Sequence, residues 1–209
     1  MATAAFILIA YLIGSLSFAV IVSRGLALPD PRSYGSGNPG ATNVLRTGKK
    51  LAALLTLIGD GGKGWLAVFL ATRYAGDYDV EAIGVSACAV AVFLGHLFPV
   101  FFGFRGGKGV STAAGILLAI HPWLGLATLA TWIIIAIFFR YSSLAAIVSA
   151  VFAPIYAFLM ALLGFELGSM LLAVILLAAL LVWRHQTNIL NLVAGKERRI
   201  GEKRDSAGA

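Results

Sequence analysis

The chain has almost no cysteine and few charged residues, and each shortage excludes a class of protein. Cys88 is the only cysteine, so an internal disulfide is excluded. Charged side chains make up 12% of the 209 residues and hydrophobic ones 60%, a balance that excludes an ordinary soluble domain. Neither an internal repeat nor a second domain is recognisable. The sequence predicts one polytopic membrane domain over residues 1–209, with a short polar tail at 202–209.

Long apolar runs take up most of the chain. They cover residues 4–23, 51–72, 82–102, 110–120, 123–139, 144–163 and 167–183. Most are long enough to cross a hydrocarbon core of roughly 30 Å as helices. The fourth run would reach only ~17 Å as a helix. We therefore expect an all-α bundle of seven transmembrane helices, the fourth being short, re-entrant or the first half of a helix that continues past Pro122.

Positive charge favours seven spans over six. With seven, every Lys and Arg except Lys63 and Arg73 falls on one side of the membrane, 14 of the 16 in the chain. Fusing the fourth and fifth runs would spread them over both sides. The positive-inside rule therefore predicts an outside N-terminus and a cytoplasmic C-terminus. Because no Lys or Arg precedes the first run and no cleavage site is evident, we expect it to be a retained helix.

Three polar segments interrupt the apolar pattern on the cytoplasmic side. They are GSGNPGATN (35–43), GHLFPVFFGFRGGKGV (95–110) and HQTNILNLVAGKE (185–197). Glycine lets backbone N–H groups approach an anion, and Ser, Asn, Lys, Arg and His donate hydrogen bonds to phosphate oxygens. The loop at 24–50 is also longer than a simple connection needs, although its Gly, Asn, Pro and Ser residues suit an ordinary turn-rich loop equally. Together the segments indicate a membrane protein that binds phosphate.

The second segment does not contain a nucleotide-binding loop. Walker A needs a glycine six residues before the lysine and Ser or Thr after it, but Phe102 and Gly109 occupy these positions around Lys108. We therefore expect that the protein does not bind ATP. Gly106, Gly107, Lys108 and Gly109 still precede a predicted helix N-terminus, whose dipole favours an anion. The alternative is a plain loop whose charges set topology.

The net charge of +7 does not indicate nucleic acid. The basic residues lie on one face of a membrane protein, without the aromatic residues of a nucleic-acid-binding module. We expect no nucleic-acid partner, and attribute the charge to topology and to anionic lipid of the bilayer.

Ionisable residues near and within the spans need partners. Asp60 and Lys63 lie three residues apart, so we expect them to pair inside the bundle, as structural support or as support for a site. His96 is expected to be a hydrogen-bonded structural residue rather than a base. His185 shares a helix face with Asn188, which suggests a site; the alternative is a basic tail flanking the membrane.

The segments GSGNPGATNVLR, GHLFPVFFGFRGGKGVSTAAG and RHQTNILNLVAGKE, in this order, closely resemble those of the bacterial acyl-phosphate:glycerol-3-phosphate acyltransferases. The resemblance runs through nearly the whole chain. It implies a seven-helix enzyme of the bacterial inner membrane with its active site on the cytoplasmic side. Such an enzyme transfers a fatty acyl group from acyl phosphate to the sn-1 hydroxyl of glycerol 3-phosphate, giving lysophosphatidate and phosphate, the first step of phospholipid synthesis. The resemblance implies no cofactor and no metal. It does imply a functional link to the enzyme that makes acyl phosphate.

The resemblance also implies site residues, which we assign by subsite. Those expected to hold the phosphate of glycerol 3-phosphate are Arg46, Lys108, His185 and Asn188. Those expected to hold the acyl-phosphate head are Ser36, Asn38, Gly40, Thr42, Asn43, Gly106, Gly107 and Gly109. Supporting residues are Asp60, Lys63, His96 and Glu197. The catalytic residues are His185, Ser36 and Asn188, but we do not expect Ser36 to be acylated, because the donor is already activated.

Other readings remain open at this point. A transporter of organophosphates or lipid phosphates could use the same anion site, although no inverted repeat is evident and the segments gather at one face rather than the midplane. A non-catalytic scaffold would leave the three segments unexplained. The His-x4-Asp pattern of another acyltransferase group is absent, which disfavours acyl-CoA and acyl carrier protein as donors. Either His185 or the substrate's own phosphate could accept the hydroxyl proton.

Overall fold

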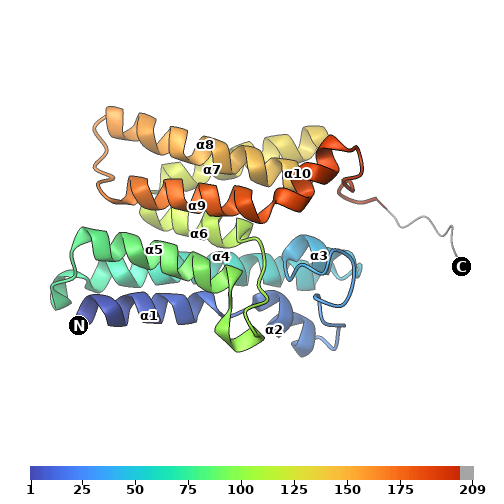
Figure 1. The fold of residues 1–209 in the computed structure, drawn as a ribbon, viewed down its shortest axis with the longest axis horizontal. Helices are drawn as coiled ribbons and strands as arrows, with labels where there is room; N and C mark the ends of the chain where they lie inside the picture. The colour runs from blue at the N-terminus through green and yellow to red at the C-terminus, as the bar shows by residue number, and fades with distance from the viewer. Residues whose placement is uncertain (203–209) are drawn as a thin grey trace, which may run out of the picture.

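The computed structural model describes residues 1–202, and this part of the chain is entirely helical apart from its connections. Its α-helices are α1 (Ala2–Gly14), α2 (Phe18–Gly25), α3 (Ala41–Leu45), α4 (Lys50–Tyr74), α5 (Ala82–Leu97), α6 (Val110–Ile120), α7 (Pro122–Phe139), α8 (Ser142–Leu162), α9 (Met170–Arg184) and α10 (Gln186–Val193). Two 3-10 helices, η1 (Gly76–Tyr78) and η2 (Val100–Phe102), lie in connections. The long helices run along the long axis of the molecule (Figure 1). The all-α expectation is confirmed for residues 1–202, while all but the first residue of the predicted tail lies outside them.

The apolar runs of the sequence are helices in the structure. Among residues 1–202, four segments are long and apolar enough to cross a membrane alone: Lys50–Tyr74, Ala82–Phe102, Pro122–Phe139 and Ser142–Leu162. The number rises to six if each of two bent pairs is one span, α1 with α2 at 43° and α9 with α10 at 57°. The short helix Val110–Ile120 has the predicted bounds and falls below the length of a full span.

The first apolar run is not one continuous helix, so that part of the prediction is wrong. The chain leaves helical geometry after Gly14 and resumes it at Phe18. The break presents the carbonyl of Leu16 to the Lys63 ammonium, which donates to it at 2.6 Å. The hydroxyl of Ser15 accepts a hydrogen bond from the backbone N–H of Val100 at 3.3 Å. The Lys63 ammonium thus satisfies a carbonyl that an unbroken helix would satisfy internally, and the Ser15 hydroxyl satisfies the N–H of Val100.

A sharp turn separates the short helix α6 from α7. His121 is extended at φ −158° and ψ 126°, and Pro122 opens α7, where its fixed φ is favourable. The two helices then pack against each other so closely that a Cβ on Gly125 would lie 2.5 Å from Leu118 Cγ. This arrangement excludes a single helix through Pro122, which the sequence had left open.

Glycines bring α6 into direct contact with α4. A Cβ on Gly64 would lie 2.4 Å from the Thr112 carbonyl oxygen, and one on Gly115 would lie 1.9 Å from that of Gly61. Small residues allow such backbone approach in membrane bundles. In Figure 1, α6 lies between a group formed by α1, α4 and α5 and a group formed by α7, α8 and α9. Its N-terminus is thereby fixed where the two groups meet.

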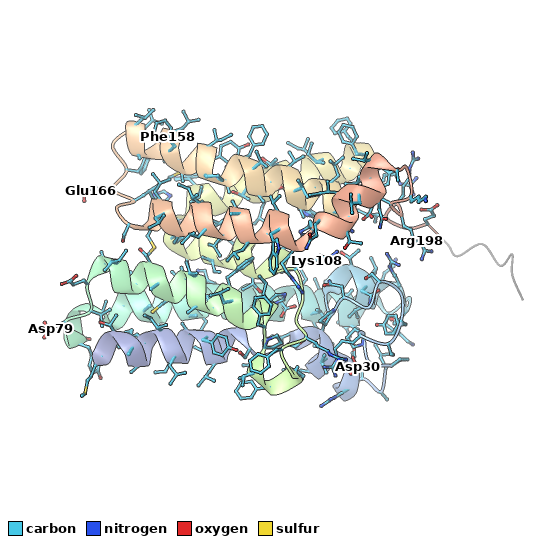
Figure 2. All side chains as sticks on the ribbon, in the orientation of Figure 1. Asp30, Asp79, Lys108, Phe158, Glu166 and Arg198 are labelled. Atoms are coloured by element: carbon cyan, nitrogen blue, oxygen red, sulfur yellow. The ribbon has the colours of Figure 1, made fainter. Side chains whose placement is uncertain are left out.

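The two ends of the molecule differ in their charged side chains. Figure 2 labels Asp79 and Glu166 at one end, and Lys108, Arg198 and Asp30 toward the other. The second end also carries α3, α10 and the glycine-rich loops (Figure 1). The three polar segments of the sequence therefore lie at one end of the bundle.

Candidate functional site

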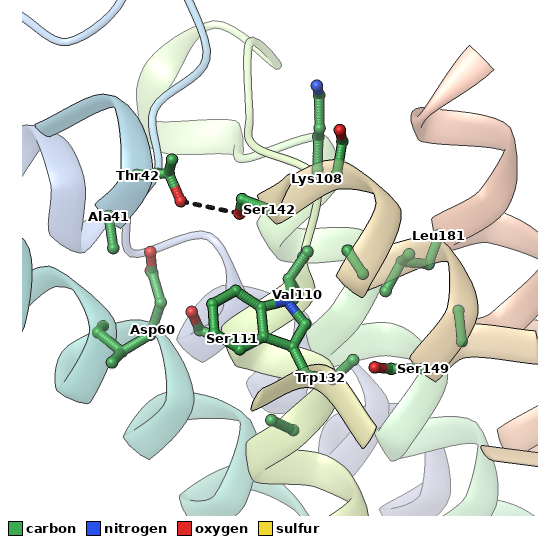
Figure 3. Close-up of a pocket in the computed structure, with 18 of the residues that line it drawn as sticks. Ala41, Thr42, Asp60, Lys108, Val110, Ser111, Trp132, Ser142, Ser149 and Leu181 are labelled. Carbon is green, nitrogen blue, oxygen red and sulfur yellow. Dashed lines mark hydrogen bonds between the residues drawn. The ribbon is translucent and has the colours of Figure 1, made fainter. Parts of the chain in front are cut away.

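The three polar segments meet around one cavity of about 570 Å³. Its mouth is polar: Lys108 and His185 contribute to it from the second and third segments, and Arg46 contributes from just after the first. Further in, the cavity continues between α6, α7, α8 and α9 along mainly apolar side chains. In Figure 3, Thr42, Ser142 and Lys108 lie on one side of the Trp132 ring, and Ser149 lies deeper along α8. The site therefore joins a charged entrance to an apolar interior.

Most of the expected site residues line this cavity. They are Ser36, Asn38, Gly40, Thr42, Asn43, Arg46, Asp60, His96, Lys108, Gly109 and His185. The others lie behind the lining, in contact with it or with the loops that form it: Lys63, Gly106, Gly107, Asn188 and Glu197.

Asn43 maintains the shape of the first glycine loop. Its buried amide donates to the carbonyl oxygens of Pro31 at 2.7 Å and Tyr34 at 3.1 Å, and its own oxygen accepts from the Ser36 N–H at 3.0 Å. Gly35 has a φ of +61°, and a Cβ there would lie 2.2 Å from Asn43 Oδ1, so only glycine fits. Within residues 1–202, the side chains of Ser36 and Asn38 form no hydrogen bond and are available to a ligand.

Arg184 holds the second glycine loop, although the sequence analysis did not place it in the site. Its guanidinium donates to the carbonyl oxygens of Gly106 at 3.2 Å and Gly107 at 3.1 and 3.3 Å. The N–H of Gly107 donates to the His96 carbonyl at 3.2 Å. With these groups engaged, the Lys108 side chain and the Gly109 backbone are directed to the cavity. The available signal was the position of Arg184 directly before His185.

A hydrogen-bonded chain leads from Lys108 to a carboxylate. The Lys108 ammonium donates to Asn188 Oδ1, and the amide of Asn188 donates to Glu197 Oε1 at 2.7 Å. The Ser143 hydroxyl donates to the same oxygen at 2.6 Å. Burial lowers the pKa of Lys108, and Glu197 opposes this effect. Since Glu197 is reached through Asn188, the ammonium itself has no directly bonded anion among residues 1–202.

Arg46 adds a second positive charge at the mouth. Its guanidinium lines the cavity and, within the described residues, forms neither a hydrogen bond nor an ion pair with another side chain. An arginine with five free donors beside a partly buried lysine is suited to an anion with several oxygen atoms. The entrance is therefore electropositive and carries the donors that a phosphate group requires.

His185 faces the cavity with one tautomer fixed by its partner. The side chain is 2% exposed, and Nδ1 lies 2.8 Å from the carbonyl oxygen of Leu181. A carbonyl can only accept, so Nδ1 carries a hydrogen, and Nε2 of the neutral imidazole is an acceptor. His185 can therefore accept a hydrogen bond or a proton from a molecule in the cavity.

The predicted pair of Asp60 and Lys63 is present, at 2.9 Å and fully inside the bundle. The hydroxyl of Thr112 donates to the backbone carbonyl of Asp60 at 2.9 Å and lies 3.1 Å from His96 Nδ1. His96 in turn contacts Gly107 so closely that a Cβ there would lie 2.4 Å from Nε2. This buried cluster links α4, α5 and α6 beneath the glycine loop and supports its position.

Known proteins resemble this chain in both sequence and fold. A family model described as glycerol-3-phosphate acyltransferase matches residues 4–195. The chain is 63% identical over 204 residues to a glycerol-3-phosphate acyltransferase of Cupriavidus pinatubonensis, covering 98% of this chain and 99% of the relative. It is 64% identical over 206 residues to one of Ralstonia pickettii, covering 99% and 98%.

Solved structures agree with the sequence relatives. The fold is similar to the crystal structure of PlsY (YgiH), an integral membrane glycerol 3-phosphate acyltransferase, in its glycerol 3-phosphate form, with a TM-score of 0.86 and 34% identity over 96% of both chains. The lysophosphatidic acid form of that protein gives a TM-score of 0.85, at the same identity and coverage.

Proposed function

This chain belongs to the glycerol-3-phosphate acyltransferase family, and we propose that it transfers a fatty acyl group from an acyl phosphate to the sn-1 hydroxyl of glycerol 3-phosphate. The products are lysophosphatidate and inorganic phosphate, so the reaction opens phospholipid synthesis. The donor is a reactive mixed anhydride. An enzyme that makes acyl phosphate must therefore supply the donor to this acyltransferase.

The observation that carries this proposal is the union of a cationic mouth and an apolar interior in one cavity. Along α8, the lining extends from Ser142 to Ala153, and along α9 from His185 to Val174, each a distance of ~16 Å at ~1.5 Å per residue. Hydroxyl groups in this inner part are bonded to their own helices: Ser149 to the Ala145 carbonyl at 2.7 Å, and Thr128 to Leu124 at 2.9 Å. The interior thus suits a hydrocarbon chain, and the mouth suits a phosphate.

Two phosphate groups must be held at the mouth. Lys108 and Arg46 bind the phosphate of glycerol 3-phosphate through charge-assisted hydrogen bonds, with Asn188 orienting the Lys108 ammonium. Ser36, Asn38, Gly40 and Thr42, together with the backbone N–H of Gly109 at the start of α6, bind the acyl-phosphate head. Asn43, Gly106 and Gly107 shape the two loops through the bonds described above.

The chemistry requires positioning more than a strong base. The sn-1 oxygen of glycerol 3-phosphate attacks the acyl carbonyl carbon, and the tetrahedral oxyanion is stabilised by donors at the start of α6. The bond from the acyl carbon to the phosphate oxygen then breaks, and inorganic phosphate leaves with the electron pair. The hydroxyl proton passes to His185 Nε2 or to a phosphate oxygen of the substrate. Ser36 acts through hydrogen bonding and is not acylated.

We place the protein in the bacterial cytoplasmic membrane as a single domain of seven spans, with the short helix α6 as the fourth. The turn at His121 reverses the chain between α6 and α7, as this count requires. The basic end that contains Lys108 faces the cytoplasm, in accord with the positive-inside rule. The N-terminus is then outside, and the active site is open to cytoplasmic glycerol 3-phosphate.

Purified protein in detergent or vesicles tests the proposal. Phosphate release that requires both acyl phosphate and glycerol 3-phosphate, with formation of lysophosphatidate, is the expected result. Use of acyl-CoA in place of acyl phosphate would refute the donor. Uptake of glycerol 3-phosphate into vesicles without product would instead identify a transporter.

A further inference from the structure

The cavity ends inside the bundle on a well-packed floor, while its side between α4 and α7 is lined by the half-exposed Leu54, Leu57 and Ile133. Its deepest lining residues on three helices are Leu117, Ala153 and Val174. These three are also members of a separate buried cluster, completed by Leu124, Ala157 and Leu167. Packing of this kind excludes further atoms unless the side chains move. The cavity therefore has a defined inner limit about 16 Å from its mouth, at ~1.5 Å per helical residue.

Small side chains of α8 keep the space above this floor open. Ala150 and Ala153 line the cavity and are 6% and 4% exposed. They lie one turn apart, ~4.5 Å along the helix axis. A larger side chain at either position would fill the cavity at a known depth, since both Cβ atoms are carried on a helix that borders it.

We propose that the floor formed by Leu117, Ala153 and Val174 sets the longest acyl chain that this enzyme transfers efficiently. The inference rests on the proposed use of acyl phosphate. The reacting carbonyl must stay at the mouth, beside Lys108 and the start of α6, so a straight tail has to fit between this point and the floor. A longer chain has to bend outward past Leu57 and Ile133, displace the floor or withdraw its carbonyl from the site.

A distance along α8 corresponds to a number of carbon atoms in the acyl chain. An extended chain of single bonds advances roughly 1.2 Å per bond, as in an extended polypeptide, where three backbone bonds span ~3.5 Å. Raising the obstruction by one helical turn should thus shorten the preferred chain by about four carbons. Ala153→Leu should shift the preference toward shorter chains, and Ala150→Leu should shift it further.

The experiment is a competition among decanoyl, dodecanoyl, tetradecanoyl, hexadecanoyl and octadecanoyl phosphate with saturating glycerol 3-phosphate. Mass spectrometry of the lysophosphatidate products gives the ratio of kcat/KM values within one sample, and this ratio is independent of how much enzyme is folded. In the filled variants, we expect the ratio of long to short products to fall about tenfold or more, the scale of misfit in an apolar pocket.

Two further variants complete the design. Val151→Leu adds bulk at the same depth of α8 on a side chain that is 49% exposed and does not line the cavity, so its profile should match the wild type. Val174→Ala removes atoms from the floor and should extend the profile toward longer chains. If Ala153→Leu or Ala150→Leu is inactive with every acyl phosphate, the chain-length profile of Val174→Ala decides whether the floor sets the chain length.

Unchanged profiles in Ala153→Leu and Ala150→Leu, or in Val174→Ala where those are inactive, would overturn the floor as the determinant of length. That result would leave the acyltransferase reaction intact. Failure of the wild type to use any acyl phosphate would refute the proposed donor instead, so the two failures are distinguishable.

Discussion

Lys108 and Arg46 form the positive charge at the mouth, and the proposed reaction gives them a measurable role. Lys108→Ala and Arg46→Ala should each raise the KM for glycerol 3-phosphate by roughly 10- to 100-fold, because each removes a charge-assisted hydrogen bond of ~1.5–3 kcal/mol. Steady-state kinetics at saturating acyl phosphate measure this. Lys49→Ala is the control, since Lys49 is an exposed residue outside the cavity lining. An unchanged KM in both site variants would remove these residues from phosphate binding.

The protonation of Lys108 predicts a pH dependence. Burial lowers the pKa of this ammonium, so its positive charge is present below that pKa and is lost, as the pH rises, earlier than for an ordinary lysine. The kcat/KM for glycerol 3-phosphate, which reports the free enzyme, should therefore fall on the alkaline side. Lys108→Arg should move this fall to higher pH, because guanidinium stays protonated. The same alkaline limb in both proteins would assign the titration to another group.

Variants of His185 distinguish a role in substrate binding from a role in proton transfer. We expect His185→Gln to keep much of the turnover and His185→Ala to raise mainly the apparent KM, because the donor is already activated and carries basic oxygens of its own. If the imidazole is instead an essential base, both variants should lose about 10²-fold or more in kcat. The bond from Nδ1 to the Leu181 carbonyl also has a structural role, so thermal unfolding of both variants must be compared with the wild type.

At the scale of elements, Arg184 connects the end of α9 to the glycine loop before α6. Arg184→Gln should reduce kcat/KM by about tenfold or more, since Lys108 loses the loop geometry that directs it. Arg184→Lys should restore little of the lost kcat/KM, because one ammonium cannot reproduce the planar guanidinium that donates to two carbonyl groups. Arg140→Gln is a matched control: Arg140 also donates to a backbone carbonyl, that of Ile200, but outside the cavity. Full activity in Arg184→Gln would show that the loop keeps its shape without this contact.

The elements that sequence reasoning located are those whose signal is local. The apolar runs and the short helix at 110–120 follow from composition and length alone. The break after Gly14 was missed because Lys63, which donates to the freed carbonyl of Leu16, lies 47 residues after Leu16. Arg184 was missed for the same reason, as its bond to Gly107 spans 77 residues. The spacing of His185 and Asn188 indicated a helix, but the bend of 57° that separates α10 from α9 was not expected, since the eight residues of α10 are too few and too polar to register as an apolar run.

For the whole molecule, the proposed topology predicts where reporters will be found. A reporter fused after Ala209 should be cytoplasmic, and one inserted near Asp77 should be outside, because basic residues gather at the end that carries Lys108 and Arg198. Accessibility to a membrane-impermeant label in whole cells measures both. Labelling of both sites from the same side would contradict a seven-span arrangement.

The break between α1 and α2 has a consequence for how the chain enters the bilayer. Lys63 carries an ammonium into the middle of α4, where an isolated positive charge costs ~2.5–3.5 kcal/mol by insertion scales. Asp60 neutralises it within the same helix, and the Leu16 carbonyl supplies a further acceptor. The N-terminal segment leaves the ribosome before α4 does. It is therefore already present to complete the coordination of the ammonium, and a chain that lost this segment would leave α4 with an incompletely solvated charge in lipid.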